Sequence, residues 1–347
     1  MVARQDAPVI DPPTTSLPEP GSVFAGHVVE AMVGRGGMGV VFRARHRSLG
    51  RVVALKVIVP ELLEDATVQQ RFLEEAVTAA SIEHPNIVPV HDAGESDGVA
   101  YMVMRYVHGM DLRDVVRDTG PLTPARAADI VAKVADALDS MHGAGYVHRD
   151  VKPRNVLIAG SGHVYLSDFG LARQVEGSSG ATRAGHWVGT VDYVSPEQVC
   201  GYRADARSDV YALGGLLHFA LTGRPAYERD TDEEKLWAHL YAPAPVPSRL
   251  QPGIPPAMDA GIARAIAKDP ADRFASAGEL ARAALAAARG KRSGVRPAPV
   301  RRRRPPTAPD AATVSHPAPH PAVRAGRSRR ARLAGALGAA LACASHG

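Results

Sequence analysis

The sequence predicts an α+β protein in which a small strand-rich region precedes a larger helical region. Between residues 28 and 59, short segments rich in Val, Leu and Ile are separated by glycine-containing turns, which is typical of strands. From residue 123 onward, apolar residues instead recur at three- and four-residue spacing over long segments, which is typical of helices. The 347 residues suffice for one large or two ordinary domains, and the 45 % apolar content allows a sizeable core.

The expected elements follow in order along the chain. Residues 1–23 are rich in Pro, Thr and Ala and cannot bury a core, so we expect them to be disordered. Thr123 can cap the helix predicted at 123–142, and the segment 208–222 is apolar all round, as in a buried helix. The remaining expected elements are strands at 28–32, 40–44, 51–59 and 101–107, a strand that starts at 84–88, a strand, turn and strand between Asn155 and Asp168, and helices at 65–81, 258–267 and 277–288.

A glycine-rich segment lies between the first two predicted strands. Residues 34–41 are Gly-Arg-Gly-Gly-Met-Gly-Val-Val, and glycines allow backbone amides to approach phosphate groups closely. In dinucleotide-binding folds a similar motif opens a helix, whereas here Val40, Val41 and Phe42 continue as a strand. Taken alone, the segment is equally compatible with a flexible hairpin turn.

Lys56 lies within the apolar strand that follows. Burying an unpaired ammonium is costly, so Lys56 needs an anionic partner, either a phosphate or a carboxylate on the next helix. On the helix predicted at 65–81, Glu75 shares a face with Phe72, so we expect Glu75 to point inward and pair with Lys56. Glu74 is the second choice and should face solvent. The alternative for Glu75 is an ordinary exposed acid.

The most informative segment spans residues 146–170. It contains Tyr-Val-His-Arg-Asp-Val-Lys-Pro-Arg-Asn and, after a short apolar stretch, Ser-Asp-Phe-Gly. An Asp that accepts a hydroxyl proton, together with an Asn and a second Asp that hold magnesium, is what phosphoryl transfer requires. Asp150, Asn155 and Asp168 supply these groups in that order. Each motif alone is weak evidence, but the ordered set rarely arises by chance.

These motifs together resemble the catalytic core of the eukaryotic-type (Hanks-type) protein kinases. The segments Gly-Arg-Gly-Gly-Met-Gly, His-Pro-Asn-Ile-Val and Ser-Pro-Glu-Gln are similar to those of the bacterial serine/threonine kinases. The resemblance covers about residues 24–289. It implies a two-lobed protein kinase fold, with an antiparallel sheet and one helix at 24–104, a hinge, and a mainly helical lobe at 110–289.

The resemblance implies that ATP binds between the two lobes. Met104 would be the gatekeeper, and Arg105 and Val107 would contact adenine through their backbone. Family members often carry an acid where this chain has Arg105, which would alter the local electrostatics. The implied ATP-binding residues are Val33, Gly34, Arg35, Gly36, Gly37, Met38, Gly39, Val41, Ala54, Lys56, Glu75, Met104, Arg105 and Val107.

The resemblance also assigns the chemistry. Asp150 would be the base that orients the substrate hydroxyl, and Lys152 would neutralise charge on the transferred phosphate, as in Ser/Thr-specific members. Asn155 would act in catalysis and, with Asp168, hold Mg²⁺, for which Mn²⁺ is an alternative. Two other interpretations carry less weight: His148 as a general base, since it is a packed structural residue in this family, and Asp168 as a turn residue before a glycine.

Regulation would centre on the polar segment 171–197. Arg149 can hold a phosphate on this segment by charge-assisted hydrogen bonds, and Thr182 is the expected autophosphorylation site, with Ser178 and Ser179 as further candidates. Thr190 would contact Asp150 and Lys152 and favour Ser or Thr acceptors.

Residues at the end of this segment and beyond it are also expected to organise it. The family pairs Glu197 with Arg273. Ser195 replaces the more usual Ala before Pro-Glu, a mild departure. Asp209 could bond the catalytic-loop amides or complement the dipole at the start of its helix, and both can hold together.

The charge is unevenly distributed. The segment from residue 289 onward contains 13 Lys and Arg and one acid, a net +12, which leaves −7 for the rest of a chain whose total is +5. We expect residues 290–347 to be a basic, disordered tail with a short apolar end. The apolar stretch 333–344 is twelve residues long, shorter than the roughly twenty that span a membrane.

These features favour a cytoplasmic protein. The two cysteines, Cys200 and Cys343, are too few for a disulfide framework or a zinc cluster. No signal peptide is predicted at the start of the chain. Peripheral membrane contact through the basic tail is the alternative location. Nucleic-acid binding is not expected, because no aromatic residues interleave the arginines.

The function expected is ATP- and Mg²⁺-dependent phosphorylation of Ser/Thr in proteins, for signal transduction. The partners are protein substrates and a second copy of the chain in a transient homodimer. A pseudokinase that binds without turnover is one alternative, but the intact Lys56, Asp150, Asn155 and Asp168 argue against it. A small-molecule kinase is the other, and the long segment ending in Ser-Pro-Glu favours protein substrates instead.

Overall fold

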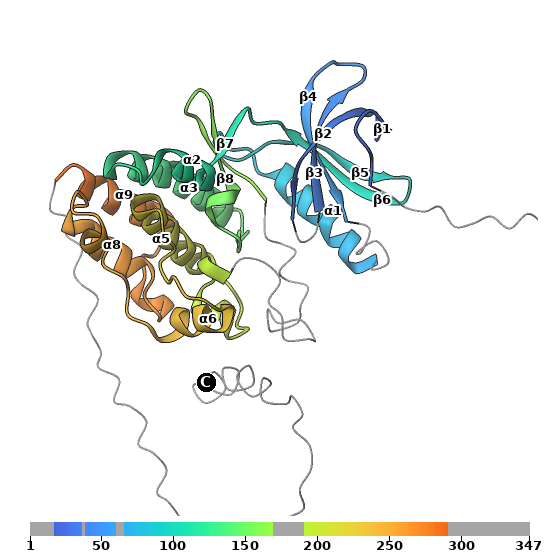
Figure 1. Cartoon of the computed structure of the whole chain (residues 1–347). Helices are drawn as coiled ribbons and strands as arrows, with labels where there is room; N and C mark the ends of the chain where they lie inside the picture. The colour runs from blue at the N-terminus through green and yellow to red at the C-terminus, as the bar shows by residue number, and fades with distance from the viewer. Residues whose placement is uncertain (1–16, 37–38, 60–65, 169–190, 291–347) are drawn as a thin grey trace, which may run out of the picture. The chain divides into compact units, whose positions relative to one another are not determined.

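The computed structural model describes residues 17–36, 39–59, 66–168 and 191–290 (Figure 1). Its N-terminal part is an antiparallel sheet of six strands in the order β1-β2-β3-β4-β6-β5. The strands are β1 (Val23–Phe24), β2 (His27–Arg35), β3 (Gly39–His46), β4 (Val52–Ile58), β5 (Val90–Ser96) and β6 (Val99–Arg105). The strands expected at 28–32, 40–44, 51–59 and 101–107 are present, although β6 ends two residues earlier than predicted.

One helix, α1 (Ala66–Ser81), covers a face of this sheet. Its inner face carries Phe72 and Ala76, which pack with Ala54 and Ile58 of β4 and Met102 of β6 in one buried cluster. The alternation of side chains along β4 and β6 explains the cluster, because a strand presents every second residue to the same face.

The start of the sheet lies earlier than predicted. Residues 17–23 were expected to be disordered, but Gly21 N donates to Val29 O at 2.8 Å and Val29 N donates to Ser22 O at 2.9 Å. Leu17 packs against the cluster of buried residues that includes Phe24. The prediction of disorder was wrong for residues 17–23, because amino-acid composition does not reveal the hydrogen bonds that a segment forms with the edge of a sheet.

The C-terminal part is helical. Thr123 caps α3, as predicted, by accepting a hydrogen bond from Arg126 N, and Gly223 ends α5 in the left-handed conformation at φ 72°. Helix α5 is buried along nearly its whole length, which agrees with its uniformly apolar sequence. The helices are α2 (Leu112–Thr119), α3 (Pro124–Gly143), α4 (Pro196–Val199), α5 (Ala206–Thr222), α6 (Asp232–Tyr241), α7 (Pro247–Leu250), α8 (Pro256–Ala265) and α9 (Ala277–Ala288).

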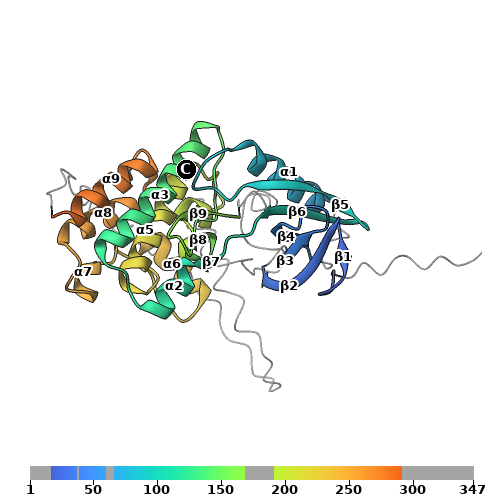
Figure 2. The ribbon, with the colours of Figure 1, turned by 90° about the horizontal axis from the view of Figure 1, so that it is seen from above.

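A second, three-stranded sheet lies where the two parts meet (Figure 2). It has the order β7-β8-β9, formed by β7 (Gly109–Asp111), β8 (Val156–Ala159) and β9 (Val164–Leu166). Leu166 N donates to Asn86 O at 2.7 Å, and Leu166 O accepts from Val88 N at 3.0 Å, which ties β9 to the segment before β5. Asn155 and Asp168 flank this small sheet, so its position sets theirs.

The α+β class predicted from the sequence is therefore confirmed: an antiparallel sheet with one helix precedes a mainly helical part. Within the described residues, none of the helices combines the length and apolarity that crossing a bilayer would require.

Candidate active site

Asp209 anchors the segment that joins α3 to β8. This carboxylate, at the start of α5, is buried and accepts hydrogen bonds from the backbone N–H of His148 at 2.8 Å and of Arg149 at 2.7 Å. His142 Nε2 at the end of α3 lies 2.7 Å from the same carboxylate. Asp209 thus bonds the backbone of this loop, as the sequence suggested, and joins it to two helices.

The hydrogen bonds to Asp209 hold the backbone of Arg149 in an unfavourable conformation. Arg149 has φ 66°, in the left-handed region that non-glycine residues avoid at a cost of roughly 1–3 kcal/mol. Asp209 fixes the N–H of Arg149, and Gln198 Nε2 on α4 donates to its carbonyl oxygen at 3.2 Å. These bonds from α4 and α5 keep the next residue, Asp150, directed toward the two side chains described below.

Asp150, Lys152 and Asn155 form one hydrogen-bonded group. Lys152 Nζ donates to Asp150 Oδ2 at 2.6 Å. Asn155 Nδ2 donates to the same oxygen at 3.1 Å and to the Asp150 carbonyl at 2.9 Å. The 3₁₀ turn η2 (Pro153–Asn155) brings Asn155 back toward Asp150. A carboxylate bonded to an ammonium and an amide is held in a fixed orientation, which a base for a hydroxyl proton requires.

Asp168 forms an ion pair with Lys56. Lys56 Nζ on β4 is 2.9 Å from Asp168 Oδ1, and the Lys56 charge holds the pKa of Asp168 below its usual range. Asp168 has φ 54° and so repeats the left-handed strain seen at Arg149. Ser167 links the two sides, since its N–H donates to Asn155 O at 2.9 Å.

His148 is fully buried and structural. Asp150 N donates to its Nδ1 at 3.3 Å, which leaves the ring proton on Nε2, where it faces Ser167 O at 3.2 Å. Burial lowers the pKa of His148, so the ring is neutral at physiological pH. A neutral ring bonded to backbone on both sides agrees with the packed role expected for it.

Four of the apolar residues predicted to bind ATP lie in or against one cluster. Ala54 and Met104 are buried in it, while Val41 and Val107 pack against its edge. Leu157 of β8, which was not singled out in the sequence, packs there too. The sequence could have indicated Leu157 as a binding residue, because it lies two residues after Asn155 on the strand that faces the linker between β6 and β7. Arg105 points away, with Nη1 donating to Tyr165 Oη at 2.9 Å.

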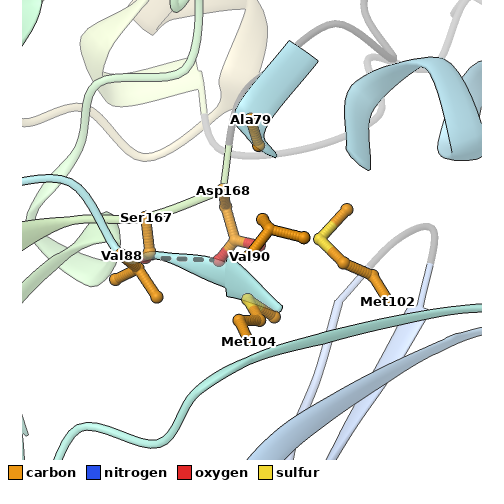
Figure 3. Close-up of a pocket in the computed structure, with 7 residues that line it drawn as sticks. All are labelled: Ala79, Val88, Val90, Met102, Met104, Ser167 and Asp168. Atoms are coloured by element: carbon orange, nitrogen blue, oxygen red, sulfur yellow. Dashed lines mark hydrogen bonds between the residues drawn. The ribbon is translucent and has the colours of Figure 1, made fainter. Parts of the chain in front are cut away.

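A small pocket is lined in part by Met104. Figure 3 shows Asp168 and Ser167 facing Val88, Val90, Met102 and Met104, with Ala79 of α1 above them. Ser167 Oγ donates to Asp168 Oδ2 at 3.5 Å across this space. The pocket places the carboxylate of Asp168 next to the apolar cluster that would hold the base of a nucleotide.

The glycine-rich segment forms the β2–β3 hairpin, as predicted. Gly36 N donates to Gly39 O at 2.8 Å, and a Cβ on Gly39 would lie 2.8 Å from Val57 O, so only glycine fits against β4 there. Val33, Gly34 and Arg35 end β2. Gly37 and Met38 lie outside the described residues. Glu75 lies on α1, but its side chain is not described, so its pairing with Lys56 stays a prediction.

Glu197 and Arg273 form a buried ion pair. Arg273 Nη1 and Nη2 each lie 2.7 Å from a different oxygen of Glu197, and Ser208 Oγ donates to the same carboxylate at 2.6 Å. Burial opposes ionisation, yet the hydrogen bond and charge of Arg273 keep the pKa of Glu197 below its usual value. The pair joins α4 to the turn before α9 and so links two segments of the helical part.

The regulatory residues are only partly described. A surface pocket beside Arg149 is lined by Tyr146, Arg203 and Asp205 among others. Ser178, Ser179, Thr182 and Thr190 lie outside the described residues, so their predicted roles are not addressed by the structure.

The residues around Asp168 fit a magnesium ion. Mg²⁺ binds proteins through few carboxylate or amide oxygens and keeps its other ligands for phosphates and water. Asn155 and Asp168 offer one amide oxygen and one carboxylate, and Ser167 holds their backbones together. Lys56 beside Asp168 can contact a phosphate bound to the same ion.

Comparisons with known proteins agree with this geometry. The family model described as "Protein kinase domain" matches residues 27–284. Serine/threonine-protein kinase PknD of Mycobacterium tuberculosis is 46 % identical over 270 residues, covering 78 % of this chain and 40 % of PknD. Serine/threonine-protein kinase PknH of Mycobacterium bovis is 44 % identical over 264 residues, covering 76 % of this chain and 44 % of PknH.

The chain thus spans less than half the length of these relatives. The crystal structure of the Mycobacterium tuberculosis PknI kinase domain superimposes with a TM-score of 0.62 at 33 % identity, covering 78 % of this chain and 98 % of that one. The matched family model, the identity and the shared fold lead to one conclusion: the chain belongs to the protein kinase domain family.

Proposed function

We propose that this chain transfers the γ-phosphate of ATP to Ser and Thr hydroxyls of proteins. The observation that carries the proposal is a pair of hydrogen-bonded groups linked through Ser167, Asp150 with Lys152 and Asn155 in one and Asp168 with Lys56 in the other. The relatives' names describe serine/threonine-protein kinases, and Lys152 at its position supports the same specificity.

Each residue has a role that its contacts support. Asp150 accepts the proton of the incoming hydroxyl, and Lys152, 2.6 Å from it, offsets the negative charge that builds on the transferred phosphoryl group. Lys56 holds the α- and β-phosphates. Asn155 and Asp168 hold Mg²⁺, which neutralises the charge on the phosphate oxygens when bound. Positioning and charge stabilisation are nearly all that this reaction asks of a protein.

The finer parts of the proposal concern regulation and context. Phosphorylation of Thr182 by a second copy of the chain would create an anion that Arg149 can bind, ordering the segment before Glu197. Thr190 would help to orient the acceptor hydroxyl. We propose a kinase domain over residues 24–289 and a basic tail from 290 that either leaves the protein in the cytoplasm or attaches it to anionic membrane.

The test is transfer of labelled γ-phosphate from ATP with Mg²⁺, to the chain itself and to a basic protein, in the wild type, Asp150→Asn and Lys56→Met. Label on Ser and Thr in the wild type alone is the expected result. Equal label in all three would identify a contaminant, and no label despite bound nucleotide would overturn the catalytic role. Mapping of the labelled residues would test Thr182, because an active protein unmodified between 171 and 190 contradicts that site.

A further inference from the structure

Three basic side chains meet at the end of the six-stranded sheet beside the linker to β7. Arg51 directly precedes β4, His91 lies on β5, and Arg105 is the last residue of β6. Because β6 pairs with both β4 and β5, the three positions lie on adjacent strands, with Arg105 paired to Val53. Arg51 Nη2 donates to His91 Nε2. We call Arg51, His91 and Arg105 the basic cluster.

The positive charge of this cluster is not neutralised locally. Among the residues that the structure describes, no carboxylate forms an ion pair with Arg51 or Arg105, whose side-chain hydrogen bonds go to His91 and Tyr165. On the neighbouring strand, by contrast, Arg43 and Arg45 both pair with Glu30. Partial burial and then the two guanidinium groups lower the pKa of His91, so the positive charge of the cluster resides on the two arginines.

Arg105 is held in place before any ligand arrives. Its Nη1 donates to Tyr165 Oη at 2.9 Å, and its guanidinium lies 5.8 Å from the centre of the Tyr165 ring. The Tyr165 ring packs on His163, with ring centres 4.4 Å apart, and His163 Nε2 is 2.7 Å from Pro85 O. A guanidinium fixed in this way loses less conformational entropy on binding an anion than a freely rotating one.

We propose that the basic cluster binds an acidic segment of a partner polypeptide. Arginine forks recognise carboxylates with two parallel hydrogen bonds, and two forks on adjacent strands can take two neighbouring acidic side chains. The three residues are exposed, so a single carboxylate would gain little against water. Several acids linked in one segment bind together, because the first contact raises the effective concentration of the next. Charge complementarity therefore favours a polypeptide over a free small anion.

The site would be separate from the phosphate-transfer groups but connected to them. Arg105 ends the strand that leads into the linker, and Tyr165 lies on β9, three residues before Asp168. The bound segment is a ligand of the kinase domain and not its phosphate acceptor, so binding does not depend on turnover.

The test is a direct binding measurement with a capped hexaglutamate peptide carrying a neutral dye. Fluorescence anisotropy is followed with the full chain, Mg²⁺ and a saturating non-hydrolysable ATP analogue, which keeps the peptide away from Lys56 and Lys152. The double variant Arg51→Gln/Arg105→Gln is expected to raise the dissociation constant at least about tenfold. Arg51→Gln alone, which keeps the Arg105–Tyr165 contact, is expected to give a smaller increase.

The basic tail supplies the matched control. Arg302→Gln/Arg303→Gln removes the same charge from the tail and is expected to leave the dissociation constant within about twofold. The proposal is overturned if the peptide does not bind, if the tail variant weakens binding as much as the cluster variant, or if the cluster variant binds like the wild type. Tighter binding of a single-stranded oligonucleotide of equal charge at the same residues would also overturn it.

Discussion

Lys56 Nζ and Asp168 Oδ1 lie 2.9 Å apart although 112 residues separate them in the chain. Lys56 belongs to the central strand β4, whereas Asp168 follows β9 of the small sheet. Their contact joins the proposed phosphate-binding side of the site to the proposed metal-binding side. It also satisfies the charge of a lysine that is largely buried, with 14 % of its side chain exposed.

Asp168→Asn should test the contribution of metal binding apart from the rest of the site. The amide cannot offer the same negative oxygen to Mg²⁺, so we expect phosphate transfer to fall at least about a hundredfold. We also expect Mg²⁺ to lose most of its effect on ATP affinity, measured by calorimetry with and without the ion. Asp129→Asn, which removes an exposed carboxylate on α3, is the control and should behave like the wild type. An undiminished effect of Mg²⁺ in Asp168→Asn would remove Asp168 as a metal ligand.

Asp209→Ala should disturb the catalytic loop beyond its effect on stability. The variant leaves the N–H groups of His148 and Arg149 unsatisfied, each at a cost of about 1–3 kcal/mol, and frees the strained Arg149 backbone to relax. Asp139→Ala is a matched control, because Asp139 likewise accepts from two backbone amides, those of Ala277 and Gly278, away from the site.

Both variants should lower the unfolding midpoint, but only Asp209→Ala should lower kcat strongly, with little change in KM for ATP. Equal kcat losses in the two variants would show that Asp209 acts through general stability alone.

Arg273→Ala should be strongly destabilising. Glu197 would stay buried without its partner, at a cost of roughly 3–5 kcal/mol measured by chemical denaturation. The double variant Glu197→Gln/Arg273→Met removes both charges and should lose clearly less than Arg273→Ala. Arg126→Ala, which breaks an exposed ion pair with Asp129, should cost about 0–1 kcal/mol. A cost for Arg273→Ala no greater than that of Arg126→Ala would argue against the pair as a structural anchor.

Lys268 should make stability depend on pH above neutrality. Its Nζ donates to Tyr227 Oη and to the carbonyls of Ala238 and His239 at the end of α6, with no carboxylate among these acceptors. Burial and then the charge of Arg273 lower the pKa of Lys268 to about 7. Between pH 7 and the ordinary lysine value of about 10.4, the unfolded chain therefore binds more protons than the folded one.

Stability from this group rises with pH across that window, with a slope of up to about 1.4 kcal/mol per pH unit. The measurement is the free energy of unfolding of the wild type minus that of Lys268→Met, from pH 6.5 to 9.5, in which the titration of other groups cancels. We expect the difference to grow in favour of the wild type as the pH rises. A difference that stays constant with pH would mean that Lys268 remains protonated in the folded state.

The local pattern of the sequence determined much of this protein. The alternation of apolar residues predicted β3 and β4, and the helical spacing predicted α1, α3 and α5, because each element must bury one face or all of itself. The chemistry of Asp150, Asn155 and Asp168 at their spacing indicated phosphoryl transfer before any fold was known. Such sequence patterns are local. They predict structure wherever an element or a loop forms its interactions within a few residues of the chain.

The tertiary structure decided the rest. The three-residue strand β7 is too short for a periodic pattern, and α6 has a weak one, so neither was expected. The 2.9 Å contact of Lys56 with Asp168 and the assembly of Arg51, His91 and Arg105 depend on which strands pair. Strand pairing is set by the burial of whole faces against one another. Contacts between residues far apart in sequence therefore exist only once the core has formed.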